Sequence, residues 1–218
     1  MKFLEAIIFD LDGTLIHSAP DIQYASNEAL KSIGRNPLDI NTIISFIGNG
    51  SEVLVDRIID VTGGGNEALK RTIFETFMEI YEENITTFTV PYPGVVNALA
   101  EFKANGIKLG ICTNKPNKAA IDICDKLGIA IYFDTIVGAV NDKPKKPDPF
   151  LLKKCIKTLE TNIDNALFVG DSAIDFNTAV ATSIDFKLYS GGYLNEPYPD
   201  FSKLNQFSDW NNHNITYD

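Results

Sequence analysis

The apolar residues of this chain change their spacing at two points. Residues 4–10 (LEAIIFD) form a short apolar run that ends in an aspartate, as expected for a parallel strand buried on both faces. From about residue 19 to residue 85, apolar positions recur at helical i, i+3, i+4 spacing. Gly34, Gly48-Asn49-Gly50 and Gly63-Gly64-Gly65 interrupt this pattern as turns. The pattern predicts a small four-helix unit.

From Pro91 onward the pattern alternates between strand and helix. We expect helices over 94–105, 117–127, 149–159 and 173–182, and strands over 107–113, 135–137, 166–171 and 184–189. Repeated βα units of this length build a doubly wound parallel sheet, a Rossmann-like α/β core. The first strand most simply joins the same sheet. Residues 1–15 and 91–218 are therefore predicted to form the core, and residues 16–90 an inserted helical cap.

The net charge of the chain limits the kinds of molecule that it is expected to bind. The 218 residues carry 19 Lys and Arg against 29 Asp and Glu, a formal net charge of -10. Such a chain is a poor candidate for binding nucleic acid or anionic membranes. A small anionic substrate still fits, because a binding site needs only a local positive field. The sequence leaves monomer and homodimer equally open.

Cysteine, histidine and hydropathy exclude further classes. No stretch approaches the ~18 apolar residues of a membrane helix. Three cysteines without a CxxC spacing favour a reducing, cytoplasmic setting over a disulfide framework. Only His17 and His213 are present, which leaves little for a zinc site or a phosphohistidine.

Polar residues follow three of the predicted strands, where ligands bind in such sheets. Asp10 and Asp12 follow the first strand, and Asp171 follows a later one with Asp175 four residues on. Paired carboxylates repel one another unless a cation lies between them. Hard oxygen ligands without a nearby histidine favour Mg²⁺.

The same residues suit phosphoryl transfer. Asp10 could attack phosphorus as a nucleophile, and Asp12 could protonate the leaving oxygen and later deprotonate water. The charge that grows on the phosphoryl oxygens needs donors. We expect these from the Thr113 hydroxyl, the Asn114 backbone amide and a lysine of the proline-rich loop 143–149.

Each feature taken singly also has a plain structural interpretation. Asp-Gly is a common turn pair, Asp171 suits a helix N-cap, and lysines in a loop are usually solvated. His17 is interpreted as a polar neighbour at the hinge between the two units. The catalytic interpretation depends on the features occurring together and in order.

Four segments together resemble the haloacid dehalogenase superfamily: FDLDGT at 9–14, ICTN at 111–114, KPDP at 146–149 and GDSAID at 170–175. The resemblance implies that Asp10 is the nucleophile and Asp12 the acid/base. It also implies Mg²⁺ held by the Asp10 side chain, the Asp12 carbonyl and Asp171, with Asp175 in support. The inserted helices then correspond to that superfamily's first type of cap.

Within the superfamily, DLDGTLIHSAPDI at 10–22 and IGNGSEVLVDR at 47–57 are similar to the phosphoglycolate phosphatase group. This resemblance implies 2-phosphoglycolate as substrate and a substrate-binding cap loop at Gly48, Asn49 and Gly50. For the catalytic lysine we prefer Lys146, because Pro-Asp-Pro-Phe follows it, and Lys143 stays open.

Three other functions are compatible with parts of this pattern. Related sugar-phosphate mutases tend to carry Gly-x-Ser-Arg at the cap loop, whereas Gly48-Asn49-Gly50-Ser51 has no arginine. A receiver-like regulatory domain shares a carboxylate, a threonine and a lysine, but it has no inserted cap. A haloalkanoic dehalogenase needs no Mg²⁺, so the full acidic set would be superfluous.

Overall fold

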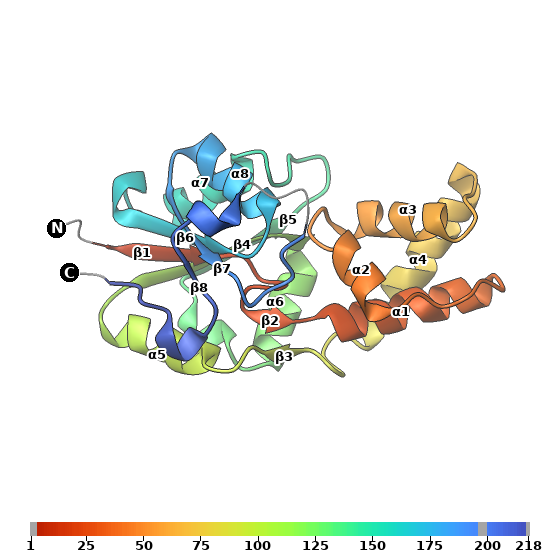
Figure 1. The fold of residues 1–218 in the computed structure, drawn as a ribbon, viewed down its shortest axis with the longest axis horizontal. Coiled ribbons are helices and arrows are strands. Elements are labelled where there is room, and N and C mark those ends of the chain that lie inside the picture. Colours follow the sequence, from red (N-terminus) through yellow and green to blue (C-terminus); the bar gives the residue numbers. More distant parts are fainter. Residues whose placement is uncertain (1–3, 196–199, 217–218) are drawn as a thin grey trace.

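A six-stranded parallel sheet organises one half of the molecule (Figure 1). The computed structural model describes residues 4–195 and 200–216. The strand order is β5-β4-β1-β6-β7-β8. The strands are β1 (Ala6–Phe9), β4 (Lys108–Pro116), β5 (Thr135–Ala139), β6 (Ala166–Gly170), β7 (Asp185–Tyr189) and β8 (Gln206–Phe207). The predicted parallel α/β fold is confirmed.

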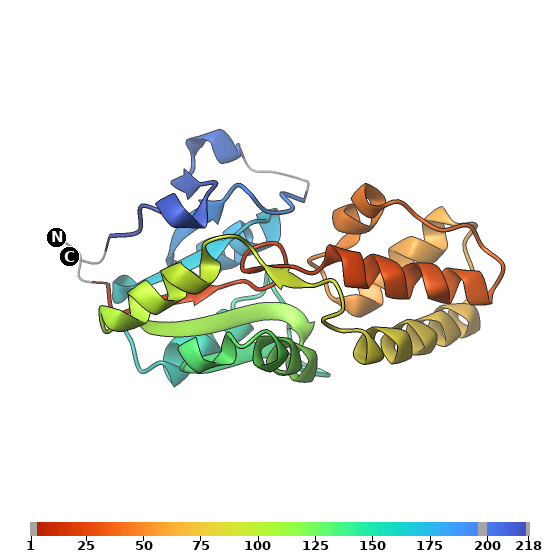
Figure 2. The same ribbon diagram turned by 90° about the horizontal axis from the view of Figure 1, so that it is seen from below.

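Strand β1 lies inside the sheet because its sequence is apolar on both faces. It pairs with β4 on one side and β6 on the other, and all four of its residues are buried. One face is covered by α5 (Val95–Ala104) and α6 (Asn117–Lys126), the other by α7 (Phe150–Thr158) and α8 (Ala173–Thr182). Figure 2 shows the helices on both sides of the sheet. The alternation in β1 sends Ile7 and Phe9 into one core and Ala6 and Ile8 into the other.

Four helices form a separate layer beside the sheet (Figure 1). They are α1 (Ala19–Ser32), α2 (Ile40–Phe46), α3 (Ser51–Val61) and α4 (Glu67–Glu83). Their apolar stripes pack together around buried side chains such as Leu30, Ile43, Ile58 and Phe77. Side-chain caps start two of them, since the Asp39 carboxylate accepts from backbone amides at the start of α2 and Asn66 does so at α4. The predicted four helices are thus present.

Two short strands join this layer to the sheet. β2 (Ile16–His17) and β3 (Val90–Pro91) pair antiparallel where the chain leaves the sheet layer and where it returns. They coincide with the predicted ends of the inserted segment 16–90. Residues 1–3, 196–199 and 217–218 of the predicted core lie outside the described residues.

The sequence pattern did not predict every element. β4 runs on to Pro116 through an irregularity between Cys112 and Pro116, so it extends three residues beyond the predicted strand end at Thr113. Neither β8 nor the short 3-10 turns, at Ala130–Tyr132, Ile163–Asn165, Phe201–Lys203 and Trp210–Asn212, had been expected. Across the described ranges, no helix combines the length and the apolar character needed to span a membrane.

Candidate active site

The predicted site residues meet at one edge of the sheet. Asp10 follows β1, Thr113 lies in β4, and Asp171 follows β6. These three strands are adjacent and parallel, so their carboxyl ends share an edge. Strands β4 and β5 lie on one side of β1, and β6, β7 and β8 lie on the other. Such folds bind ligands at the point where the strand order reverses in this way.

Three buried carboxylates form an acidic cluster at this edge. Oxygens of Asp10, Asp171 and Asp175 all lie within 4.8 Å of one another. Burial raises the pKa of Asp10 to about 7, and the charges of Asp175 and Asp12 add to the rise while Lys146 opposes it. Burial and the neighbouring Asp175 and Asp10 also raise the pKa of Asp171 well above its usual value. The cluster is therefore electrostatically short of positive charge.

Asp171 is held by the loop that follows β1 and by a segment near the end of the chain. Its Oδ1 accepts from the Thr14 hydroxyl at 2.7 Å, and its Oδ2 accepts from the Tyr193 backbone amide at 2.7 Å. Gly13 adopts φ +87° against this carboxylate, so a β-carbon there would collide with it. The DxDGT sequence thus folds directly around Asp171. Nothing in the sequence pattern indicated Tyr193.

Lys146 supplies the positive charge inside the cluster. Its Nζ lies 2.7 Å from Asp10 Oδ1 and 2.7 Å from Asp175 Oδ1, with the lysine side chain only 2% exposed. Asp10 Oδ1 nevertheless has no well-directed hydrogen bond from any described residue. Of the two lysines left open by the sequence, Lys143 is exposed, so the geometry favours Lys146. Its catalytic role stays a prediction.

Asp175 acts on its neighbours through both oxygens. Oδ1 accepts from Lys146, and Oδ2 accepts from the Ser172 amide at 3.1 Å and from its hydroxyl at 2.6 Å. The Asp175 amide in turn donates to the Ser172 hydroxyl oxygen, which completes a capping box at the start of α8. Asp175 therefore orients Lys146 as well as lining the cluster.

Asp12 lies two residues beyond Asp10 and has separate partners. Its Oδ1 accepts from the Ser18 hydroxyl at 2.5 Å, and both of its oxygens lie 3.0 Å from Lys115 Nζ. Lys115 is buried, and the Asp12 charge raises its pKa although burial alone would lower it. Sequence reasoning did not select Lys115. No signal of strand parity could have selected it, because the pairing of β4 is irregular between Cys112 and Pro116.

The Asn114 side chain connects three parts of the site. Its Oδ1 accepts from the Lys146 amide at 2.7 Å, while its Nδ2 donates to the carbonyls of Lys146 and Gly48, both at 2.9 Å. Asn114 thus fixes the lysine loop to β4 and touches the loop before α3. Thr113 is buried beside it and lines the cavity described next. The roles of both residues in phosphate binding stay predictions.

A cavity separates the sheet edge from the helical unit. Asp10, Asp12, Thr113, Asn114 and Lys115 line it from the sheet side. Its opposite wall is mainly apolar: Ile22, Ile47, Leu54, Phe77, Met78 and Tyr81. About 60 Å³ is open to the centres of water-sized molecules, which is room for only a few waters. The cavity suits a small polar molecule.

The predicted cap loop reaches this cavity in part. Gly48 and Gly50 line it, whereas Asn49 is not among the lining residues. Gly50 is also the N-cap of α3, as the sequence predicted for a turn at a helix start. Both glycines have left-handed φ values, +122° and +91°. Alanine at either position would strain the backbone, so glycine replacement would alter the loop as well as any ligand contact.

Two further contacts hold the helical unit against the core. The Asn195 Nδ2 donates to the carbonyls of Ile44 and Ile47 at 2.8 and 2.7 Å. Lys145 Nζ lies 2.8 Å from Glu52 Oε2 in the first turn of α3. The two sides of the cavity are thus in direct contact in this conformation.

The cysteines and His17 are not among the described residues that line the cavity. All three cysteines are free and buried, and burial raises the pKa of the Cys112 thiol to about 12. His17 lies in the β2 linker, 3.4 Å from the Tyr193 hydroxyl, and burial lowers its pKa. Its role as a polar neighbour at the hinge stays a prediction.

Comparison with known proteins agrees with the fold. Residues 7–188 match the family model described as haloacid dehalogenase-like hydrolase. The chain is 37% identical over 206 residues to a phosphoglycolate phosphatase of Cereibacter sphaeroides, with 94% of each chain covered. A crystal structure of a predicted phosphoglycolate phosphatase from Haemophilus somnus superposes with a TM-score of 0.88 at 30% identity, covering 95% of both chains. A β-phosphoglucomutase of Clostridium difficile shares the fold, with a TM-score of 0.77 at 24% identity over 95% of this chain and 92% of that one.

The chain belongs to the haloacid dehalogenase-like hydrolase family. The resemblance predicted from four short segments is therefore confirmed. Together with its curated relatives, the fold assigns a phosphoric monoester hydrolase that acts on a small phosphorylated substrate. Phosphatases of this family generally use Mg²⁺, and the three buried aspartates present the oxygen ligands that this ion prefers.

Proposed function

We propose that this enzyme hydrolyses 2-phosphoglycolate with Mg²⁺ through an aspartyl phosphate on Asp10. The cavity over Asp10 and Asp12 carries the proposal, because a phosphate ester bound there would meet both carboxylates on one side and a mainly apolar wall on the other. The phosphoglycolate phosphatases among the relatives support the same substrate. A screen of phosphorylated metabolites tests it, with 2-phosphoglycolate expected to give the highest kcat/KM. A clearly higher value for another ester would contradict the substrate assignment.

Two displacements at phosphorus complete the reaction. A carboxylate oxygen of Asp10 attacks the phosphorus, the bond to the ester oxygen breaks, and Asp12 gives that oxygen its proton. Asp12 then takes a proton from water, whose oxygen attacks the same phosphorus. The bond to Asp10 breaks, which releases inorganic phosphate and restores the carboxylate. Lys146 and Thr113 would stabilise the charge on the phosphoryl oxygens.

The side chains of the acidic cluster are suited to binding Mg²⁺. Three buried carboxylates lie close together, and Asp10 Oδ1 lacks a well-directed donor. We propose that Asp10 and Asp171 hold the ion with the Asp12 carbonyl, and that Asp175 supports them. The bound ion would neutralise charge on the phosphoryl group and the nucleophile.

Removing Mg²⁺ should inactivate the enzyme and also lower its thermal stability. Folded Asp10 keeps a proton up to about pH 7, well above its usual 3.8, so the metal-free protein loses stability as pH rises between these values. Mg²⁺ at roughly 100 times its Kd should raise Tm by about 5–10 °C at pH 8. We expect a smaller rise at pH 5.5, where a proton competes for Asp10. Calorimetry with and without EDTA measures both.

Matched variants separate the ion's site from general salt effects. Asp171→Asn should lose most of the Mg²⁺-dependent rise in Tm, whereas Asp125→Asn, on the exposed side of α6, should keep it. Ca²⁺ should bind without supporting turnover, because its larger shell relaxes the geometry of phosphoryl transfer. Full activity in excess EDTA would rule out the proposed metal role.

We propose that residues 16–90 act as a cap that closes over the substrate on the β2–β3 linkers. In the described conformation the hydrogen bonds from Asn195 to Ile44 and Ile47 favour closure. Such closure excludes water from the reacting groups. The cap would also bring its apolar wall against the two-carbon part of the substrate.

Asn195→Ala should raise KM for 2-phosphoglycolate by about 5- to 30-fold, because two hydrogen bonds that favour closure are lost. A small aryl phosphate, which gains less from closure, should change much less. Steady-state kinetics on both substrates measure the difference, and Tm of the variant checks the fold. Equal changes with both substrates would argue that Asn195 acts on the catalytic edge instead.

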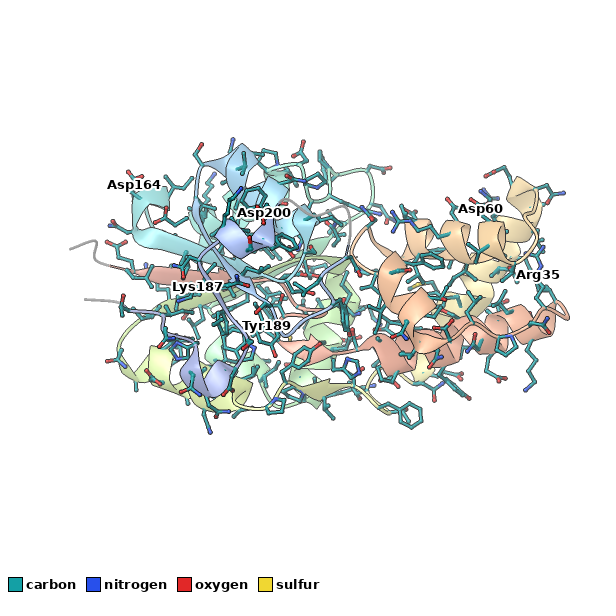
Figure 3. The ribbon with its side chains drawn as sticks, in the orientation of Figure 1. Arg35, Asp60, Asp164, Lys187, Tyr189 and Asp200 are labelled. Carbon is teal, nitrogen blue, oxygen red and sulfur yellow. The ribbon has the colours of Figure 1, made fainter. Side chains whose placement is uncertain are left out.

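A sugar-phosphate mutase is less well supported. No arginine is among the described residues that line the cavity, and Arg35 lies at the end of the helical unit far from the core (Figure 3). Product analysis with a hexose 1-phosphate distinguishes the two reactions, since a mutase would return the 6-phosphate. The three unpaired cysteines support a cytoplasmic location, which we propose with the function.

A further inference from the structure

Lys115 is a buried cation at the floor of the cavity, next to the acid/base residue. Its side chain is 4% exposed, and its Nζ lies 3.0 Å from both oxygens of Asp12. Among the described residues that line the cavity, Lys115 is the only lysine or arginine. The reaction as proposed gives this charge no contact with the substrate. Asp12 already pairs with this buried cation, and an anion that enters the cavity could share the same charge.

Tyr81 faces the same charge from the opposite wall. It comes from α4 of the helical unit, is 4% exposed, and its ring centroid lies 5.0 Å from Lys115 Nζ. Its hydroxyl is buried and makes no well-directed hydrogen bond to the described residues, although the Lys115 ammonium is near enough to act on it. A buried hydroxyl without a well-directed hydrogen bond costs stability, so an acceptor that arrives with the ligand would complete its hydrogen bonding. Tyr81 and Lys115 both line the cavity.

The position of Lys115 and Tyr81 relative to Asp12 determines which part of a substrate they can contact. Asp12 must lie within about 3 Å of the leaving oxygen to protonate it, and Lys115 is in contact with Asp12. In 2-phosphoglycolate the carboxylate carbon is two bonds from that leaving oxygen. A carboxylate at this distance falls within reach of Lys115 Nζ, with Tyr81 across from it. The other cap-side walls are mainly apolar and offer no competing charge.

We propose that Lys115 and the Tyr81 hydroxyl form the subsite for the substrate's carboxylate, so that they select a phosphate ester with a second anionic group. This inference rests on the proposed function and names the groups that determine its specificity. Lys115 pairs with Asp12 before the substrate arrives and shares its charge with the substrate carboxylate afterwards. Tyr81 donates only when the helical unit is closed, which couples recognition to closure.

The test compares 2-phosphoglycolate with ethyl phosphate, the same ester with a methyl group in place of the carboxylate. Lys115→Met keeps the length of the side chain and removes its charge. We expect kcat/KM for 2-phosphoglycolate to fall by about 10²-fold more than kcat/KM for ethyl phosphate. Lys115→Arg should recover part of the preference. Lys118→Met, which removes an exposed lysine of α6, should leave both values unchanged.

Tyr81→Phe is a second test of the subsite, and its result does not depend on whether the lysine variant folds. It removes a hydroxyl that makes no well-directed hydrogen bond to the described residues, so the protein should fold normally. We expect KM for 2-phosphoglycolate to rise about 3- to 10-fold with little change in kcat. KM for ethyl phosphate should not change.

The results distinguish a failure of the proposed subsite from a failure of the proposed substrate. If Lys115→Met lowers both substrates by the same factor, Lys115 only orients Asp12 and the carboxylate subsite is wrong. If Tyr81→Phe leaves KM for 2-phosphoglycolate unchanged, the hydroxyl has no part in it. A wild-type enzyme that hydrolyses ethyl phosphate as well as 2-phosphoglycolate would overturn both the proposed substrate and the subsite. A wild-type preference that survives in both variants would overturn the subsite alone.

Discussion

Asp10→Asn is expected to abolish turnover while leaving the fold intact. The amide keeps the shape of the carboxylate but is a far weaker nucleophile and metal ligand, so we expect a loss of at least about 10³-fold in kcat. The substitution also removes one charge from a cluster in which burial and the neighbouring Asp175 raise the pKa of Asp10. Stability of the metal-free protein should therefore be equal to or above that of the wild type.

Phosphate release and thermal unfolding together test this expectation. The same assays on Asp125→Asn, an exposed carboxylate of α6, control for the loss of a negative charge. If purified Asp10→Asn retains a tenth of wild-type turnover, then Asp10 is not the nucleophile.

Asp12→Asn should give a defect that depends on the leaving group. Without its acid, the enzyme must expel an unprotonated alkoxide, which typically costs ~10²–10⁴-fold. An aryl phosphate has a leaving group that needs no proton, so its first step should be much less affected. The fold should survive, because Ser18 and Lys115 can still contact the amide oxygen at the position of Oδ1.

Rates of leaving-group release with alkyl and aryl phosphates measure this difference. With the aryl substrate, an early burst of the phenol is expected, because the variant also lacks the base that deprotonates water. Equal losses on both substrates without a burst would contradict the acid role of Asp12.

Local sequence was sufficient to predict most of the fold, because the pattern of apolar residues in each strand or helix shows which of its faces are buried. The run Ala6–Phe9 is apolar at every position, which only a strand covered on both faces satisfies. The alternation of strand and helix after Pro91 then requires parallel pairing. Strand ends were less predictable, as the continuation of β4 to Pro116 depends on its pairing with β5.

The chemistry of the site was predictable where residues follow a central strand. Asp10, Thr113 and Asp171 were assigned to strand ends, and parallel strands bring such ends to one edge. The structure places Asp10 and Asp171 directly after β1 and β6, whereas Thr113 lies within β4, three residues before its end. The choice between Lys143 and Lys146 could not be made with the same certainty, because a loop with three prolines has no periodicity to orient its side chains.

Residues that act across long sequence separations were missed. Tyr193 binds Asp171 through its backbone amide and accepts bonds from Ser18 and Ala19 through its hydroxyl. No motif marks it, since its role depends on where the chain returns after β7. Tyr81 was interpreted as core of the helical unit. Only the packing of that unit against the sheet edge places it opposite Lys115.

By itself, the sequence determined the class of fold and the family, and it predicted which carboxylates gather at the sheet edge, since each depends on short segments whose pattern reflects one local environment. Tertiary structure alone decided which lysine joins Asp10 and Asp175, which cation faces Asp12, and how the helical unit closes the cavity. The charge contacts join residues that are 29 to 136 positions apart in the sequence. Their energies depend on distance and burial, and neither quantity exists until the chain has folded.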